Sequence, residues 1–130
     1  MNISEGGTQR VGECHCGALK VITAGEPERV YLCHCKACQR RTGTAFHFGV
    51  TYRRSQVRLA GQYKIYERGA DSGSQIRFYF CPNCGSNLRW ESERNPMLCG
   101  WPAVRSTTSI SRRARQFSRS RCIAGSNCRV

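Results

Sequence analysis

The chain has 130 residues, of which 39% are hydrophobic, and it carries ten cysteines and a formal net charge of +13. This length fits one small domain, and no apolar run reaches the roughly 18 residues that a membrane span requires. The first residues have no hydrophobic core, so we expect no cleaved secretion signal and a cytoplasmic location. These features exclude a transmembrane protein, a protein secreted by such a signal and a large multidomain enzyme.

Most of the chain alternates between hydrophobic and polar residues over short stretches, which is typical of β-strands. After a polar segment at residues 1–11, which we expect to fray, seven strands are predicted at residues 19–23, 44–52, 57–59, 63–66, 76–80, 88–90 and 97–101, whereas the apolar residues 30–32 lead directly into Cys33. Residues 37–43 predict a short helical turn closed by Gly43. His47 lies in an alternating stretch and is interpreted as an ordinary strand residue. The sequence therefore predicts a mainly β single domain of short antiparallel strands.

Seven of the ten cysteines occur in closely spaced motifs: a C-x-C pair, a central C-x-C-x-x-C motif and a final C-x-x-C pair. The seven are Cys14, Cys16, Cys33, Cys35, Cys38, Cys81 and Cys84. Such spacing suits zinc, because a tight turn directs two sulfur atoms toward one ion. Four thiolates close a structural site, whereas three leave one position open for water or substrate. We therefore predict two zinc ions, a structural one held by both pairs and a catalytic one held by the central motif.

The spacing leaves other assignments open. The first pair could join part of the central motif, and two closed sites would result if His34 or Cys99 supplied an eighth ligand. We expect His15 and His34 to lie outside the metal coordination, because their cysteine neighbours already point toward the metal. A disulfide framework is less compatible with the expected compartment, and a redox-active final pair lacks a thioredoxin-like strand and helix around it.

The last segment, residues 105–130, differs in composition from the rest of the chain. It contains seven arginines, many serines and no acidic residue, so the preceding part retains a formal charge of +6. A basic segment can bind nucleic acid through phosphate contacts, but we favour a solvated tail. We predict a zinc-binding domain at residues 11–104 and an irregular Arg/Ser-rich tail at residues 105–130 that is disordered or foreign to the domain.

Three linked motifs surround the cysteines: GECHCGAL at residues 12–19, CHCKACQRRTGTAF at residues 33–46 and FCPNCGS at residues 80–86. In this order and spacing they resemble the glutathione-dependent formaldehyde-activating enzyme family over roughly residues 11–104, and the resemblance ends near Pro102. It implies a zinc-dependent β-tent fold and a carbon–sulfur lyase that joins formaldehyde to glutathione as S-hydroxymethylglutathione. It also implies that the two pairs hold the structural zinc and the central motif holds the catalytic zinc.

Under this resemblance the expected partner is a small thiol such as glutathione, and no membrane partner is expected. A thiol in the open zinc position would become a nucleophilic thiolate, so Cys33, Cys35 and Cys38 are the predicted catalytic residues. Gln39, Arg40 and Thr42 follow the motif and are predicted to bind glutathione, with Arg40 and Arg41 oriented toward its carboxylates. The alternatives are a zinc-stabilised binding module for nucleic acid or protein and an inactive family member. Nucleic acid is expected to bind only through the basic tail.

Overall fold

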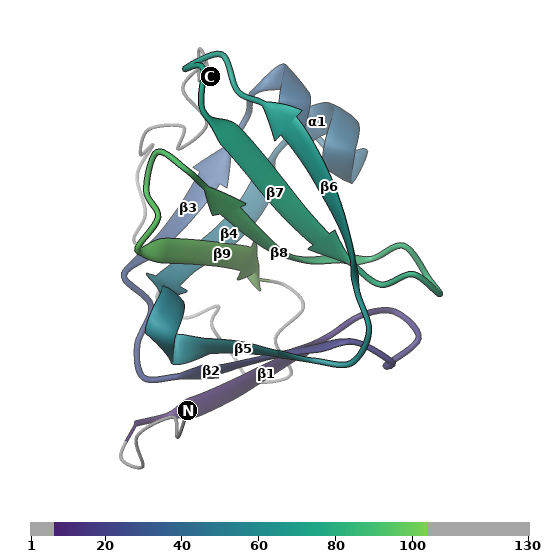
Figure 1. Cartoon of the computed structure of the whole chain (residues 1–130), viewed down its shortest axis with the longest axis vertical. Coiled ribbons are helices and arrows are strands. Elements are labelled where there is room, and N and C mark those ends of the chain that lie inside the picture. Colours follow the sequence, from purple (N-terminus) through teal and green to yellow (C-terminus); the bar gives the residue numbers. More distant parts are fainter. Residues whose placement is uncertain (1–6, 104–130) are drawn as a thin grey trace.

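The computed structural model describes residues 7–103, and the predicted tail at residues 105–130 lies outside them (Figure 1). Nine strands, one α-helix and one 3₁₀ helix form within this range. They are β1 Gln9–Glu13, β2 Lys20–Ala24, β3 Arg29–Cys33, α1 Lys36–Thr42, β4 His47–Arg53, η1 Arg54–Gln56, β5 Val57–Ala60, β6 Lys64–Gly69, β7 Gln75–Phe80, β8 Asn87–Ser92 and β9 Leu98–Pro102. The prediction of a mainly β single domain is confirmed.

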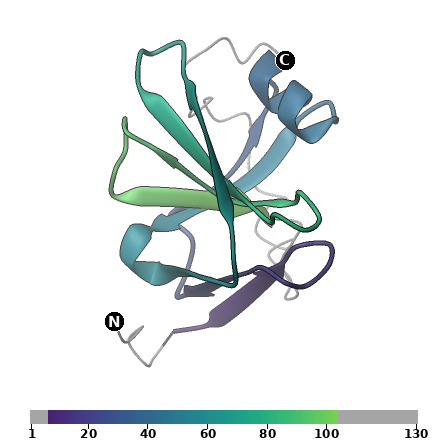
Figure 2. The ribbon, with the colours of Figure 1, turned by 45° about the vertical axis from the view of Figure 1, so that its right-hand side comes forward.

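The strands form two antiparallel sheets. The small sheet has the order β1-β2-β5, and the large sheet has the order β3-β4-β9-β8-β7-β6. Figures 1 and 2 show the small sheet below the large one, with α1 at the opposite end of the molecule. Among the described residues no helix is long and apolar enough to cross a membrane.

One face of the large sheet packs on the small sheet and forms the core. A Cβ atom on Gly12 of β1 would lie 2.2 Å from the ring of Trp101 of β9, so this ring rests directly on the small sheet. Tyr52 of β4 packs beside Trp101, with ring centroids 6.4 Å apart. The fully buried side chains include Leu19, Val21, Val50, Tyr52, Leu88 and Trp101.

The other face of the large sheet is covered by α1. Strand register places His47 across from Cys33, and Trp90 across from both Phe78 and Gly100. The guanidinium of Arg41, on α1, lies 5.1 Å from the ring centroid of Phe78 and 5.7 Å from that of Trp90. The second face is therefore aromatic, and a helix that begins inside the central cysteine motif closes it.

One expectation about the N-terminal segment is corrected. The expectation that residues 1–11 fray is wrong for residues 9–11, because they belong to edge strand β1. In this strand the Arg10 guanidinium donates a hydrogen bond to the Gly25 carbonyl (2.8 Å) and forms an ion pair with Glu26 (3.0 Å). In β4, His47 and Thr51 are buried on one face and Val50 and Tyr52 on the other, because both faces are covered.

The predicted helical turn is confirmed as α1, which spans Lys36–Thr42. At its start, the backbone N–H of Cys38 donates to the Cys35 sulfur at 3.4 Å. At its end, Gly43 has φ 69°, a left-handed conformation that favours glycine, and its N–H donates to the Gln39 carbonyl. The helix therefore carries Cys38 and both candidate arginines at a fixed position beside β3 and β4.

Candidate metal centres and the adjoining cleft

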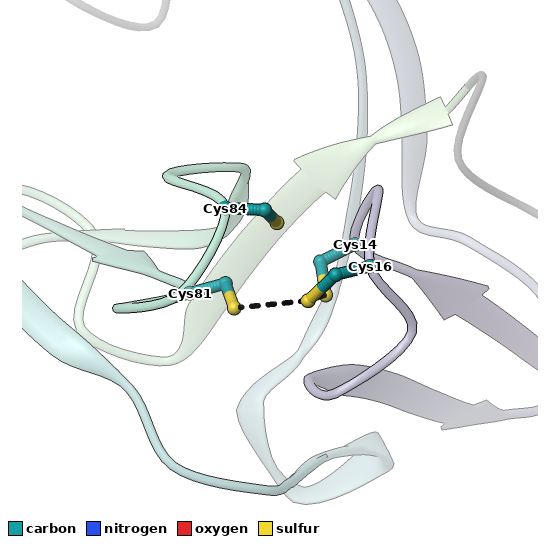
Figure 3. A group of neighbouring side chains, drawn as sticks. All are labelled: Cys14, Cys16, Cys81 and Cys84. Carbon is teal, nitrogen blue, oxygen red and sulfur yellow. Dashed lines mark hydrogen bonds between the residues drawn. The ribbon is translucent and has the colours of Figure 1, made fainter.

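The first and last cysteine pairs come together in space (Figure 3). Cys14 and Cys16 lie in the turn between β1 and β2, and Cys81 and Cys84 lie in the turn between β7 and β8. The Cys14 and Cys16 sulfurs are 3.6 Å apart, and those of Cys16 and Cys81 are 3.7 Å apart. Zinc–sulfur bonds of about 2.3 Å in a tetrahedron require sulfur–sulfur distances of about 3.8 Å. This four-cysteine group fits a zinc ion in both geometry and donor chemistry.

The central motif forms a separate three-cysteine group, made of Cys33 at the end of β3, Cys35 before α1 and Cys38 within it. All three are buried, and their sulfur atoms lie within 4.8 Å of one another. No fourth histidine, cysteine or carboxylate from residues 7–103 joins this group. Thiolate donors in this number suit zinc with one position free for another ligand.

Other residues weighed as ligands lie elsewhere. Cys99 is buried in β9, and burial raises the pKa of its thiol to about 11. His15 is exposed, and the ring of half-buried His34 lies 5.5 Å from that of Phe46. No disulfide joins any of the eight cysteines in the described part of the chain. The assignment of the two groups as a structural and a catalytic site stays a prediction.

Both groups contain a cysteine that favours the thiolate form. A hydrogen bond with Ser86, whose Oγ lies 3.3 Å from the Cys84 sulfur, lowers the pKa of Cys84 to about 5. Hydrogen bonding with Cys33 lowers the pKa of Cys38 to about 6, and the nearby charge of Arg41 acts in the same direction. The pKa of Cys33 is raised in turn, because it shares its proton with Cys38 and is buried. Thiolate character is what a metal ligand requires.

A cleft of about 1340 Å³ extends between the neighbourhoods of the two groups. It is bordered by Arg40, Arg41 and Thr42 of α1, by Arg68 of β6, and by Ser86 beside the four-cysteine group. Glu13 is the one acidic residue among its lining residues in the described range. The cleft therefore presents cations to a ligand, and anionic ligands fit it best.

The residues predicted to bind glutathione differ in their placement. Arg40 and Thr42 line the cleft, and the Thr42 hydroxyl donates to the Cys38 carbonyl at 2.8 Å. Gln39 does not line it: its amide nitrogen donates to the carbonyls of His34 (3.2 Å) and Ala45 (3.0 Å). Arg41 lines the cleft and donates to the Asn87 side-chain oxygen at 3.0 Å.

A smaller cavity of about 40 Å³ adjoins the three-cysteine group. Cys33 and Cys38 line it together with aromatic and aliphatic side chains of the large sheet. Arg41, His47 and Phe78 border both this cavity and the cleft, so the cavity is the inner end of the cleft. Its lining consists of Tyr31, Cys33, Cys38, Arg41, His47, Ile76, Phe78, Trp90 and Ser92.

His47 is the residue of this site that sequence reasoning missed. His47 does lie in strand β4, as interpreted, but it is only 3% exposed and lines the cavity beside the three-cysteine group, which the sequence did not indicate. Its ring meets those of Trp90 and Tyr31 edge-on, with centroids 4.7 and 5.8 Å away. Burial, followed by the charge of Arg41, lowers the pKa of His47 to about 3, so its imidazole is neutral at neutral pH. Only the pairing of β3 with β4 places it there.

Comparisons with known proteins bear on this site. A family model described as glutathione-dependent formaldehyde-activating enzyme matches residues 9–118. That match continues past Pro102, so the expectation that the resemblance ends there is wrong. The domain boundary at residue 104 stays a prediction. No curated protein matches the chain significantly. The crystal structure of a Rhodobacter sphaeroides protein is similar, with 24% identity and a TM-score of 0.61, covering 79% of this chain and 93% of that one. This likeness supports the fold.

Proposed function

The chain belongs to the glutathione-dependent formaldehyde-activating enzyme family, and from this premise we propose that it is a zinc-dependent enzyme of the carbon–sulfur lyase type. Its substrate would be the adduct of a small thiol and an aldehyde, such as S-hydroxymethylglutathione. The observation that carries this proposal is the three-cysteine group, which no fourth ligand from the described residues completes and which borders a cavity leading to a cationic cleft. A closed group would leave no position for a substrate.

The two cysteine groups take different roles in this proposal. Cys14, Cys16, Cys81 and Cys84 would hold a structural zinc, and Cys33, Cys35 and Cys38 would hold a catalytic one. When bound, the catalytic zinc supplies a position at which a substrate thiol is held as its nucleophilic thiolate. The three cysteines are buried, so they keep this position away from bulk water.

The cleft residues would bind and orient glutathione, which carries two carboxylates. Arg40 and Arg41 follow each other on α1 and both line the cleft, with Arg68 on β6. Charge-assisted hydrogen bonds from guanidinium groups to carboxylates are among the stronger polar contacts in proteins. Thr42 offers a hydroxyl at the same surface. Gln39 would act indirectly, because its side chain already holds the turn that follows α1.

The reaction needs no oxidant or reductant. The thiolate sulfur attacks the carbonyl carbon, a carbon–sulfur bond forms, and the carbonyl π electrons move to oxygen, which takes up a proton. The thiol loses one proton when it binds and the carbonyl oxygen gains one, so no net proton is taken up or released. Lyase activity is the reverse of this addition, with the carbon–sulfur bond breaking and the carbonyl forming again.

A thiol titration of the cobalt-substituted protein tests this proposal. Cobalt bound by three thiolates should change its absorption spectrum when glutathione is added, because the sulfur of glutathione completes its coordination. The same protein loaded with zinc should accelerate formation of the adduct from glutathione and formaldehyde. An unchanged cobalt spectrum together with no acceleration would remove the enzyme interpretation.

Arg40→Gln tests the predicted carboxylate contact. This variant should bind glutathione several-fold more weakly, since one charge-assisted hydrogen bond is lost. Binding of 2-mercaptoethanol, which has no carboxylate, should not change, and this thiol is the matched control. Equal weakening for both thiols would show that Arg40 supports the site and not the carboxylate.

A further inference from the structure

We propose that the small cavity beside Cys33 and Cys38 receives the aldehyde group of the substrate, and that a ring nitrogen of His47 donates a hydrogen bond to its carbonyl oxygen. This inference rests on the proposed function and extends it to a residue and a size limit. The roles proposed above concern the thiol: the cysteines hold the zinc that binds it, and the arginines bind its carboxylates. The present inference concerns the aldehyde.

The first support is the hydrogen bonding of His47. Neither ring nitrogen of His47 has a hydrogen-bond partner among the described residues, although the side chain is only 3% exposed. A buried polar group without a partner loses its hydrogen bonds to water with no replacement, so such groups call for an explanation. A substrate oxygen in the cavity would supply a partner for Nδ1, the ring nitrogen that is not fully buried.

The orientation of the ring identifies the nitrogen that can reach a ligand. Nε2 is fully buried, and it lies 2.6 Å from where a Cβ on Gly49 would stand, close to the Tyr31 hydroxyl. Nδ1 is not among the fully buried unpaired atoms, so it is the ring nitrogen left open to the cavity. A neutral imidazole carries one N–H, which on Nδ1 would donate to a carbonyl oxygen.

The position of the cavity suits the electrophile and not the thiol. Cys33, Cys38 and His47 all line it, so a carbonyl inside lies near both sulfur ligands and a hydrogen-bond donor. During addition the carbonyl oxygen gains negative charge while the carbon–sulfur bond forms. A fixed donor aimed at that oxygen stabilises the charge where it develops, which lowers the barrier.

The cavity also sets a size limit for the aldehyde. Its volume is about 40 Å³, whereas one water needs roughly 10–15 Å³ on the same measure. Only a few non-hydrogen atoms fit, and Ile76 and Phe78 are among the side chains that bound the space. The structure therefore favours short aldehydes, with any larger group confined to the thiol partner in the cleft.

Kinetics of the zinc-loaded protein test the role of His47. His47→Leu should lower kcat at least tenfold and raise the KM for formaldehyde, while the cobalt form binds glutathione as before. His47→Asn, which returns an N–H near the Nδ1 position, should recover part of the loss. Thr51→Val, a buried residue of the same strand that lines neither the cavity nor the cleft, is the matched control and should change little. Unchanged kinetics in His47→Leu would overturn the inference, as would loss of one metal ion, since His47 would then be a ligand.

A binding measurement keeps this inference separate from the proposed function. Formamide resembles formaldehyde in its carbonyl but does not accept a thiol readily. Titrating it into the zinc-loaded protein should shift the imidazole resonances of His47 in NMR spectra, and His47→Leu should abolish the shifts at neighbouring Trp90. Ile76→Ala should enlarge the cavity and admit a longer amide. Formamide shifts without turnover would contradict only the proposed function, whereas turnover without any His47 shift would contradict only the inference.

Discussion

Two glycines in neighbouring strands make the aromatic face of the large sheet possible. Gly49 of β4 and Gly100 of β9 leave the space that bulky side chains occupy. A Cβ on Gly100 would lie 2.2 Å from two ring atoms of Trp90, and one on Gly49 would lie 2.8 Å from the Tyr31 ring. Glycine in a strand costs conformational entropy, so its presence here is explained by close approach of a ring. These positions determine where Trp90 and Tyr31 stand around the cavity.

Gly100→Ala should therefore destabilise the protein. The added methyl group meets the rigid ring of Trp90, and overpacking of this kind costs about 1–3 kcal/mol of the free energy of unfolding. Urea unfolding followed by circular dichroism measures it on the zinc-loaded protein. Gly69→Ala on β6 is the control, because a Cβ there has nothing within 4 Å, and its effect should stay within about 0.5 kcal/mol. Equal stability of the two variants would contradict this account of Trp90 packing.

The two cysteine groups differ in which elements they connect. The four-cysteine group joins the β1–β2 turn of the small sheet to the β7–β8 turn of the large sheet, so a metal there links the two sheets. The three-cysteine group lies within the short path from β3 into α1 and links only neighbouring elements. A link between distant segments stabilises the fold more, because it restricts the unfolded chain more strongly.

Loss of one ligand from each group should consequently have different effects. Cys84→Ser should unfold the domain, since it opens the group that holds the two sheets together. Cys35→Ser should lose the more weakly held zinc and leave the sheets intact. Metal content and far-ultraviolet circular dichroism, measured on both variants, separate these outcomes. If both unfold, the distinction between a structural and an open site is wrong.

The elements show what sequence patterns can and cannot predict here. Alternation predicted seven of the nine described strands, and the Gly43 stop signal predicted α1, because these signals are local. Strand β3 was not predicted, since Val30, Tyr31 and Leu32 form a continuous apolar run without alternation. Edge strand β1 was missed, since an edge strand with a solvated side can be as polar as a loop. The spacing suggested the two cysteine pairs, yet only the structure places Cys16 next to Cys81. His47 was missed for the same reason, because its partners come from other strands and from α1.

At the scale of the whole molecule, positive charge is distributed unevenly. The seven arginines at residues 105–130 account for more than half of the net charge of +13. Within residues 7–103 several arginines are already paired, including Arg10 with Glu26, Arg53 with Glu28, and Arg54 and Arg89 with Glu91. Arg40, Arg41 and Arg68 line the cleft. Any general affinity for nucleic acid would therefore depend on residues 105–130, whereas the cleft cations would serve a small anionic ligand.

Neutralising the last segment separates these two uses of positive charge. A full-length variant with its seven arginines from Arg105 to Arg129 replaced by glutamine should lose any affinity for duplex DNA. The unchanged protein, if it binds, should weaken steeply between about 50 and 200 mM salt, because phosphate contacts release counterions. Fluorescence anisotropy measures DNA binding and its salt dependence. The double variant Arg53→Gln/Arg58→Gln is a control that removes cations from the described domain.

Glutathione binding to the cobalt form should be equal in all three proteins, since the cleft is unaltered. Salt-dependent DNA binding that survives in the neutralised variant would instead assign the contact to the domain, and it would favour a zinc-stabilised binding module over an enzyme.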